Sequence, residues 1–324
     1  MARKLCDIDF IDLYLQRDFA CFKGLAGQDT SITPVSDEFQ AEIDAIRTLC
    51  EETLKGTERR EFSFLQDDVL YRVAAFSNPH EGITFVMRQK KHEVRPLSQT
   101  GLGSSTQDAL MHKDLKGAVL VLGEMSAGKT STISAAIEAR LTEYGGLALV
   151  LEDPSETRLS GKIGKGLALQ LEVEQGRNGY SDELIRGMRS NADLFMIGEI
   201  RDGSTASEFL RGGSNGHLLF SSAHAQSISH GLTRIRSLIG GAAADVNAIM
   251  SQSLALVIYQ SIRRSPKTNG EGVNCRLTSE TLVISGATNE SAIREKINQG
   301  NFPALGDEIT AQKNAQRWVT RNDS

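Results

Sequence analysis

Cysteine is scarce in this 324-residue chain, and its few copies are scattered. Cys6, Cys21, Cys50 and Cys275 form no Cys-x-x-Cys pair, and no histidine stands at the spacing of a zinc ligand. We therefore interpret them as reduced thiols, which excludes a disulfide framework and disfavours a metal site. Reduced thiols are typical of a cytoplasmic protein.

Long apolar runs are missing as well. No window approaches the roughly 18 uninterrupted apolar residues that a membrane-spanning helix needs. The opening, MARKLCDIDFIDLYLQ, begins with basic residues, but Asp7, Asp9 and Asp12 interrupt any apolar segment of a secretory signal. We expect no direct insertion into a membrane.

An excess of positive charge is also absent. The net charge is -5, from 36 basic and 41 acidic residues, so the whole chain has no general attraction for nucleic acid or an anionic membrane. The 40% apolar content is ordinary for a folded globular protein. Since single cores usually stop growing near roughly 250 residues, we expect two domains.

The first part of the chain, residues 1–95, mixes helical and extended patterns. Apolar residues spaced three or four apart predict a helix over 37–56, and runs rich in β-forming residues predict strands over 61–64, 69–76 and 82–89. This is the pattern of a small α+β domain. The following segment contains PLSQTGLGSST, which is rich in Gly, Ser and Pro, so we place a linker or hinge over 96–110.

Residues 111–324 alternate between strand and helix patterns. The predicted strands and helices are GAVLVL, TSTISAAIEARLTEY, LALVLED, DLFMIGE, HLLFSS, a helix over 246–254, ALVIY and the helical SAIREKINQG. Such alternation predicts an α/β domain with a mostly parallel sheet. RSPKTNGEG is expected to be a loop, and the polar C-terminal residues are expected to fray.

The clearest motif is GEMSAGKT, residues 123–130, between a predicted buried strand and a predicted helix. This context favours a phosphate-binding loop over a chance glycine-rich turn. Its backbone N–H groups would face the phosphates of ATP, Lys129 would meet the β- and γ-phosphates, and the Thr130 hydroxyl would hold Mg²⁺. The predicted binding residues of this loop are Gly123, Ser126, Ala127, Gly128, Lys129, Thr130 and Ser131. The Glu124 carboxylate should point outward or reach the metal through water, because phosphates repel it.

Polar residues also end the neighbouring predicted strands. Glu199 follows DLFMIG, where it would polarise the attacking water directly or through Mg²⁺; the alternative is a solvated salt bridge with Arg201. Glu152 and Asp153 end another strand and would complete an acidic cage around Mg²⁺ and water. HLLFSSAH contributes two histidines, His217 and His224. We expect His224 to sense the phosphate state, and for His217 a structural role is equally open.

Together, GEMSAGKT, LEDPSE, MIGEIRD and GHLLFSSAH resemble the four boxes of the secretion ATPase superfamily. This family includes PilT-like pilus-retraction motors and the ATPases of type II secretion, type IV secretion and conjugation. The resemblance implies that Lys129 and Thr130 are the Walker A pair and Glu199 the catalytic Walker B glutamate. Glu152 and Asp153 then form the Asp box, Arg201 and Asp202 complete Walker B, and His217 and His224 form the His box.

The first domain carries a weaker part of the same resemblance. VLYRVAAF and ITFVMRQ are similar to family segments whose arginines contact a triphosphate. This similarity implies a catalytic role for Arg72 and Arg88. The alternative is that both arginines lie on an exposed face of a strand. LIRGMRSNAD is similar to a family segment with two arginines, which adds Arg186 and Arg189 as interface or sensor candidates. Ala192 departs from that segment, where the family usually has proline.

The resemblance implies a homo-hexamer with a PAS-like N-terminal domain and a RecA-like motor domain. ATP hydrolysis would drive type IV pilus retraction or a type IV secretion or conjugative transfer system. The motor would work at the cytoplasmic face through an inner-membrane platform or secretion-channel protein. SAIREKI is similar to a retraction-motor signature, while conjugation stays equally open. The other readings are a nucleic-acid-translocating motor, which the acidic balance disfavours, and a nucleotide-gated assembly factor.

Overall fold

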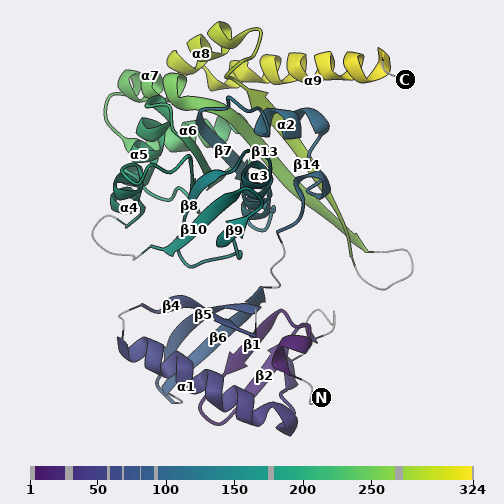
Figure 1. The fold of residues 1–324 in the computed structure, drawn as a ribbon, viewed down its shortest axis with the longest axis vertical. Helices are drawn as coiled ribbons and strands as arrows, with labels where there is room; N and C mark the ends of the chain where they lie inside the picture. The colour runs from purple at the N-terminus through teal and green to yellow at the C-terminus, as the bar shows by residue number, and fades with distance from the viewer. Residues whose placement is uncertain are drawn as a thin grey trace. The chain divides into compact units, whose positions relative to one another are not determined.

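The chain is described from a computed structural model, drawn as a ribbon in Figure 1. The structure describes residues 4–25, 32–56, 59–67, 69–80, 82–90, 94–173, 179–266 and 273–322. Contacts divide the chain into two compact units, which are Met1–Glu93 with Asp153–Arg158, and Val94–Glu152 with Leu159–Ser324. None of the described helices combines the length and the apolar character that crossing a membrane requires.

The first unit is a six-stranded antiparallel sheet with one long helix, α1 (Gln40–Gly56). The strands, in the spatial order β3-β2-β1-β6-β5-β4, are β1 (Asp12–Leu15), β2 (Ala20–Lys23), β3 (Ile32–Pro34), β4 (Glu61–Gln66), β5 (Val69–Asn78) and β6 (Gly82–Lys90). Ile43, Ile46 and Cys50 of α1 are buried in the core of this unit. The predicted helix and the predicted strands β4 to β6 are therefore present. The short strands β1 to β3 were not predicted.

The second unit is built on an eight-stranded sheet in the order β14-β13-β7-β12-β11-β8-β10-β9. The strands are β7 (Gly117–Gly123), β8 (Gly146–Glu152), β9 (Gly161–Ile163), β10 (Gly166–Glu172), β11 (Leu194–Ile197), β12 (Leu218–His224), β13 (Leu254–Pro266) and β14 (Val273–Val283). The strands from β13 to β10 pair in parallel, and only the edge strands β14 and β9 pair antiparallel. This confirms the prediction of an α/β fold with a mostly parallel sheet.

Helices cover both faces of this sheet, as Figure 1 shows. They are α2 (Ser104–Leu110), α3 (Lys129–Tyr144), α4 (Gly179–Gly187), α5 (Gly203–Ser214), α6 (Ile228–Ile239), α7 (Ala243–Ser253), α8 (Glu290–Asn298) and α9 (Leu305–Asn322). Strand β7 shows why two layers form, because it is buried along its whole length. Val119 and Val121 belong to the cluster that contains α3, while Leu120 and Leu122 belong to the cluster that contains α4 to α8.

The segment 96–110, predicted as a linker, packs instead as part of the second unit. It contains a 3-10 turn, Leu97–Gln99, and helix α2, and it buries Leu97, Leu102 and Leu110 in the α3 cluster. Arg140 of α3 donates from Nη1 to the carbonyl oxygen of Leu110 at 2.7 Å, which ties the end of α2 to α3. This packing was not evident from the sequence, because the leucines are few and are separated by glycines and serines, most of which are exposed.

The C-terminal end also differs from the expectation. Helix α9 runs to Asn322, where fraying was expected. In the predicted loop 264–272, residues 264–266 continue β13, and 267–272 lie outside the described residues. The helix predicted over 246–254 corresponds to α7, and SAIREKINQG forms α8 and the turn after it.

Candidate functional site

The phosphate loop joins β7 to α3 in the second unit. Gly128 adopts φ +81° as the residue that caps α3, and Ser126 also lies in the left-handed region at φ 58°. A Cβ at Gly123 would collide with the backbone carbonyl of Gln260. The two glycines therefore serve different needs, since Gly123 allows a close approach to β13 and Gly128 allows the turn into the helix. Glu124 is exposed, in agreement with an outward-pointing side chain.

Lys129 is the first residue of α3 and is only 8% exposed. Its Nζ donates to the carbonyl oxygens of Gly123 at 3.1 Å and Glu124 at 2.8 Å. These bonds hold the ammonium group inside the curve of the loop. A cation, a helix N-terminus and a left-handed glycine turn thus meet at one place, which is the chemistry that binds an anion.

His224, at the end of β12, connects Lys129 to Glu199. Its Nδ1 lies 3.4 Å from Lys129 Nζ, and its Nε2 lies 3.2 Å from Glu199 Oε1. In a neutral imidazole these contacts match one tautomer, in which Nδ1 accepts from the ammonium group and Nε2–H donates to the carboxylate. We call Lys129, His224 and Glu199 the edge cluster.

The turn that carries Glu199 is fixed by hydrogen bonds from β12. Ser222 donates from Oγ to the carbonyl oxygen of Gly198 at 2.8 Å, and the Ile200 N–H donates to the carbonyl oxygen of Ser222 at 2.8 Å. Arg201 holds the second carboxylate oxygen of Glu199 from Nε and Nη2, both at 3.0 Å. The salt bridge that we weighed as an alternative role for Glu199 therefore exists beside the His224 contact, and the two contacts use different oxygens.

Glu152 ends β8 and is 2% exposed. Gln170 of β10 donates from Nε2 to its Oε2 at 2.6 Å. The ends of β8 and β11 are adjacent, since Ile197 pairs with Leu151. Glu152 and Glu199 are thus on neighbouring parallel strands at the same edge, as predicted. Asp153 is half-buried and begins the segment Asp153–Arg158, which groups with the first unit.

The remaining loop residues lie in the first turn of α3 and just before it. Thr130 is half-buried, Ser131 is exposed, and Ala127 is buried. The Ala127 carbonyl oxygen accepts from Gln260 Nε2 at 2.6 Å. Thr130 directly follows Lys129 in the first turn of α3. The described residues contain no cluster of three or more His, Cys, Asp or Glu that could hold a metal by itself.

His217 is not brought to this site. It immediately precedes β12, whose Leu218 pairs with Gly117 at the start of β7, whereas His224 pairs with Gly123 at its end. The two histidines therefore stand at opposite ends of one strand. The His217 ring contacts Phe195 edge-on, with centroids 5.6 Å apart. His217 therefore packs against Phe195, and within the described residues it is not brought to Lys129 or Glu199.

Arg72 and Arg88 both lie in the first unit, where they are paired in register across β5 and β6. Arg88 makes a two-pronged contact to Asp12, with Nε to Oδ1 at 2.8 Å and Nη2 to Oδ2 at 3.1 Å. The hydrogen bond to Asp12 raises the pKa of Arg88. Arg72 contacts Glu156 at 2.8 Å and Glu61 at 3.5 Å. The two guanidinium groups thus form one row on the sheet, each held by carboxylates.

The arginines of LIRGMRSNAD lie on and just after α4. Both are exposed, and Arg186 pairs with Glu183 at 3.0 Å. Asp202, which completes the Walker B match, caps α5 by accepting from the Thr205 N–H at 2.8 Å. These residues therefore line surfaces or begin helices, and none belongs to the edge cluster.

Three polar residues at these sites were not predicted from the sequence. They are Asp12 beside Arg88, Gln170 beside Glu152, and Gln260 beside the loop. A polar residue inside an apolar strand was the available signal for Gln260, which follows ALVIY. Asp12 gave no such signal, because its strand was not predicted.

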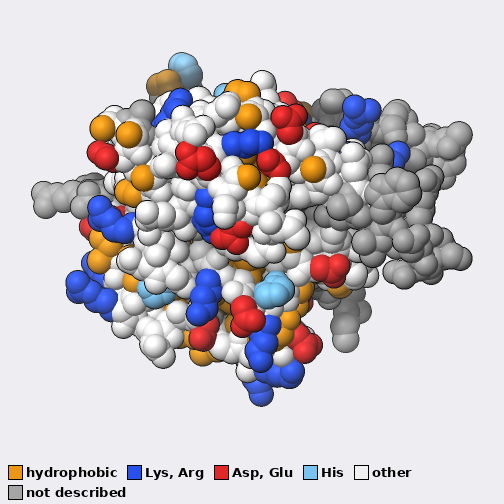
Figure 2. Space-filling model, turned by 90° about the horizontal axis from the view of Figure 1, so that it is seen from above, with side chains coloured by type: hydrophobic (Ala, Val, Ile, Leu, Met, Phe, Trp, Pro, Cys, Tyr) orange, Lys and Arg blue, Asp and Glu red, His pale blue; other side chains and the backbone are white. Residues whose placement is uncertain are grey.

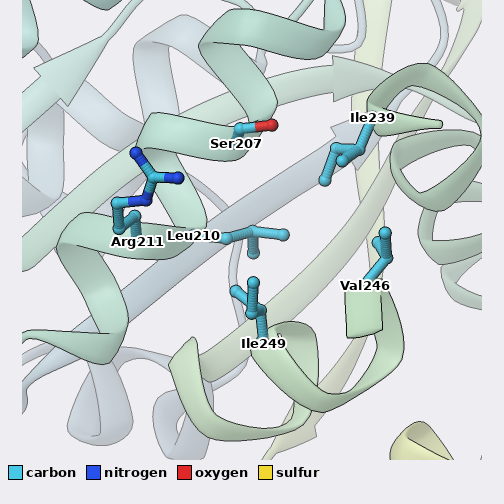
Figure 3. A pocket seen from close by; sticks show the side chains of 6 residues that line it. All are labelled: Ser207, Leu210, Arg211, Ile239, Val246 and Ile249. Atoms are coloured by element: carbon cyan, nitrogen blue, oxygen red, sulfur yellow. The ribbon is translucent and has the colours of Figure 1, made fainter. Parts of the chain in front are cut away.

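An apolar hollow of the second unit lies between α5, the end of α6 and α7 (Figure 3). It is lined by Ser207, Leu210, Arg211, Ile239, Val246 and Ile249. None of these residues belongs to the four motifs. On the face shown in Figure 2, basic and acidic side chains are intermingled, and no extended patch of one sign covers it.

Comparison with known proteins gives consistent results. Residues 40–304 match the family model described as Type II/IV secretion system protein. The chain is 30% identical over 244 residues to a twitching motility protein of Neisseria gonorrhoeae, a match covering 74% of this chain and 63% of that protein. It is 28% identical over 262 residues to the type IV pilus retractation ATPase PilT of Pseudomonas aeruginosa, covering 77% and 72%.

A solved structure shares the fold. The crystal structure of the pilus retraction motor PilT with bound ADP superposes with a TM-score of 0.75, covering 94% of this chain and 87% of that one at 22% identity. At this identity the likeness describes the fold alone. It agrees with the mixed α/β architecture and the mostly parallel sheet described above.

Proposed function

Because this chain belongs to the type II/IV secretion system protein family, we propose that it is an ATPase that turns ATP hydrolysis into mechanical work for type IV pilus retraction. The observation that carries the proposal is the edge cluster, in which one histidine joins the phosphate-loop lysine to the strand-end glutamate. The name of the Pseudomonas aeruginosa relative, a type IV pilus retractation ATPase, supports retraction. Secretion or conjugation by the same kind of motor is the alternative.

The residues present fit ATP with Mg²⁺. Gly128 provides the left-handed turn, and Lys129 provides a buried ammonium group at the helix N-terminus. Thr130 would hold Mg²⁺ through its hydroxyl, with Glu152 and Glu199 contacting it through water. When bound, Mg²⁺ would neutralise charge on the phosphates. The related fold of the PilT motor was solved with bound ADP, which supports nucleotide binding by this chain.

Each member of the edge cluster then has a defined task. Lys129 binds the phosphates, and Glu199 accepts a hydrogen bond from the attacking water and takes up its proton. His224 donates Nε2–H to Glu199, which orients the carboxylate. Its Nδ1 contacts the ammonium group of Lys129. The position of the lysine is thereby coupled to the orientation of the catalytic base.

A cation that approaches the phosphates from outside the loop would stabilise the charge of the transition state. We assign this role to Arg72 and Arg88 of the first unit, supplied by a neighbouring subunit of a homo-hexamer. The motor would act at the cytoplasmic face of the inner membrane on a platform or channel protein. Movement of one unit against the other during the ATP cycle would deliver the work.

The first test compares Mg²⁺-dependent ATP hydrolysis by the wild-type chain and by Glu199→Gln. We expect the substitution to lower kcat by roughly 10²-fold or more, because the general base is lost, while ATP still binds. Assembly is followed by light scattering over a concentration series, and hydrolysis should rise with assembly.

The matched control is Glu295→Gln, which changes an exposed carboxylate on α8. It should hydrolyse ATP like the wild type. Full hydrolysis by Glu199→Gln, or hydrolysis by a monomer that does not depend on concentration, would contradict the shared-site motor. A chain that binds ATP but hydrolyses none in any assembly state would instead be a nucleotide-gated assembly factor. Stimulation of hydrolysis by DNA would favour a nucleic-acid motor.

A further inference from the structure

Gln260 has an amide side chain at a buried position, and the residues that precede it in the strand are apolar. It lies on β13 directly after Tyr259, which pairs with Leu122 of β7, so it stands beside the end of β7. It is 0% exposed, and Val257 and Ile258 of the same strand are fully buried core residues. Its Oε1 is buried and has no hydrogen-bond partner within the described part of the chain. Such an unpaired buried acceptor is unfavourable, so the amide is not explained by packing.

The hydrogen bond made by the nitrogen of the same amide explains why glutamine is present here. Gln260 Nε2 donates to the carbonyl oxygen of Ala127 at 2.6 Å, across 133 positions of sequence. Ala127 is inside the phosphate loop, one residue before Gly128. This bond connects the loop to a strand that carries none of the four motifs.

The bond fixes the orientation of one peptide plane. In a trans peptide the C=O and N–H groups point in opposite directions. Since the Ala127 carbonyl is held toward β13, the Gly128 N–H is directed to the other side of the loop. Gly128 is the left-handed residue at which the chain turns into α3. A peptide next to such a glycine can flip at little steric cost, so it needs an external restraint.

We propose that Gln260 is a positioning residue for nucleotide binding, because it holds the Ala127–Gly128 peptide so that the Gly128 N–H faces the phosphates. This proposal rests on the proposed function of the loop. The N–H groups of such loops contact the α- and β-phosphates. ADP and ATP should therefore depend on Gln260 equally, unlike a group that senses the γ-phosphate.

The test measures the dissociation constants of ADP and ATP for the wild-type chain, Gln260→Met and Gln260→Leu. Methionine has a similar length and is flexible enough to fill the site. We expect both constants to rise about tenfold in each variant, while kcat at saturating ATP stays within about threefold of the wild type. The melting temperature should change little, because removal of the unpaired Gln260 Oε1 stabilises the folded state while the buried Ala127 carbonyl loses its donor, and the two effects oppose each other.

The matched control is Gln312→Leu. Gln312 also binds backbone through its amide, accepting from the Val283 N–H at 3.0 Å and donating to the Val283 carbonyl at 2.8 Å, but it lies on α9. The Gln312→Leu variant should be less stable than the wild type and should bind nucleotide with unchanged affinity. Wild-type affinity in both Gln260 variants would overturn the inference, as would weaker binding of ATP alone. Failure of the wild-type chain to bind nucleotide would instead overturn the proposed function.

Discussion

At the scale of single residues, the two histidines of one strand show how position decides chemistry. His224 contacts Lys129 and Glu199, whereas His217, at the other end of β12, contacts Phe195. Both residues match the same family box, so the motif alone treats them as equivalent. The structure separates a side chain that contacts Lys129 and Glu199 from one that packs against Phe195.

We predict that His224→Ala lowers kcat by about 10² while ATP binding changes little, because the donor that orients Glu199 is lost. His224→Gln should keep more activity, since its amide can still donate. The comparison variant, His217→Ala, should lower the melting temperature and leave kcat within about threefold of the wild type. Steady-state kinetics and thermal unfolding check both. Equal losses of kcat in His224→Ala and His217→Ala would contradict this prediction, because disturbance of strand β12 would then explain both losses.

At the scale of elements, helix α5 begins directly after the turn that holds Glu199 and Arg201. Asp202 caps this helix and accepts from the Thr205 N–H and from the Ser204 hydroxyl, the latter at 2.6 Å. Burial raises the pKa of Asp202, but the hydrogen bonds from Ser204 and Thr205 outweigh it, so the pKa is lower than its usual 3.8. The cap therefore stabilises the folded state in its ionised form.

We expect Asp202→Ala to lower the free energy of unfolding by about 1 kcal/mol at neutral pH. Because the folded-state pKa is depressed, the contribution of Asp202 is fully present above the usual aspartate pKa and is lost as pH falls through the folded value. The difference between wild type and variant should therefore shrink below pH 3.8. Denaturant unfolding at several pH values measures it. A difference that grows on acidification would contradict the cap.

At the scale of the whole molecule, the two units carry different parts of the proposed site. The second unit holds the phosphate loop and the edge cluster, and the first unit holds the row of Arg72 and Arg88. The arginines are engaged by carboxylates of their own unit, among them Asp12 and Glu156. If Arg72 and Arg88 act on a neighbouring subunit, as proposed, their guanidinium groups must first leave these carboxylates.

We predict that mixing two inactive variants, Arg72→Ala and Glu199→Gln, restores hydrolysis. If each site combines the arginine of one subunit with the glutamate of the next, random assembly leaves about a quarter of the sites intact. The control mixture is Lys129→Ala with Glu199→Gln, both changed in the second unit. It should stay inactive, because every site then lacks one group. No recovery in the first mixture would mean that the arginines act within their own subunit.

Much of the architecture follows from local pattern. The buried strand GAVLVL, the amphipathic helix α1 and the alternation of strands with helices are consequences of side-chain periodicity, which neighbouring residues determine. The phosphate loop was recognisable for the same reason, since its glycines and lysine are consecutive in the chain. Segment 96–110 was misread because its apolar residues are too few to show a period, although tertiary packing buries them.

By itself, the sequence determined the α/β class, the phosphate loop and the identity of the residues that end β8, β11 and β12. Only the tertiary structure decided which of these residues meet. It joined His224 to Lys129 and Glu199, left His217 at the opposite edge, and brought Gln260 to a loop 133 positions earlier in the chain. The physical reason is that periodicity acts over a few residues, whereas strand order and register set distances between residues that are far apart in sequence.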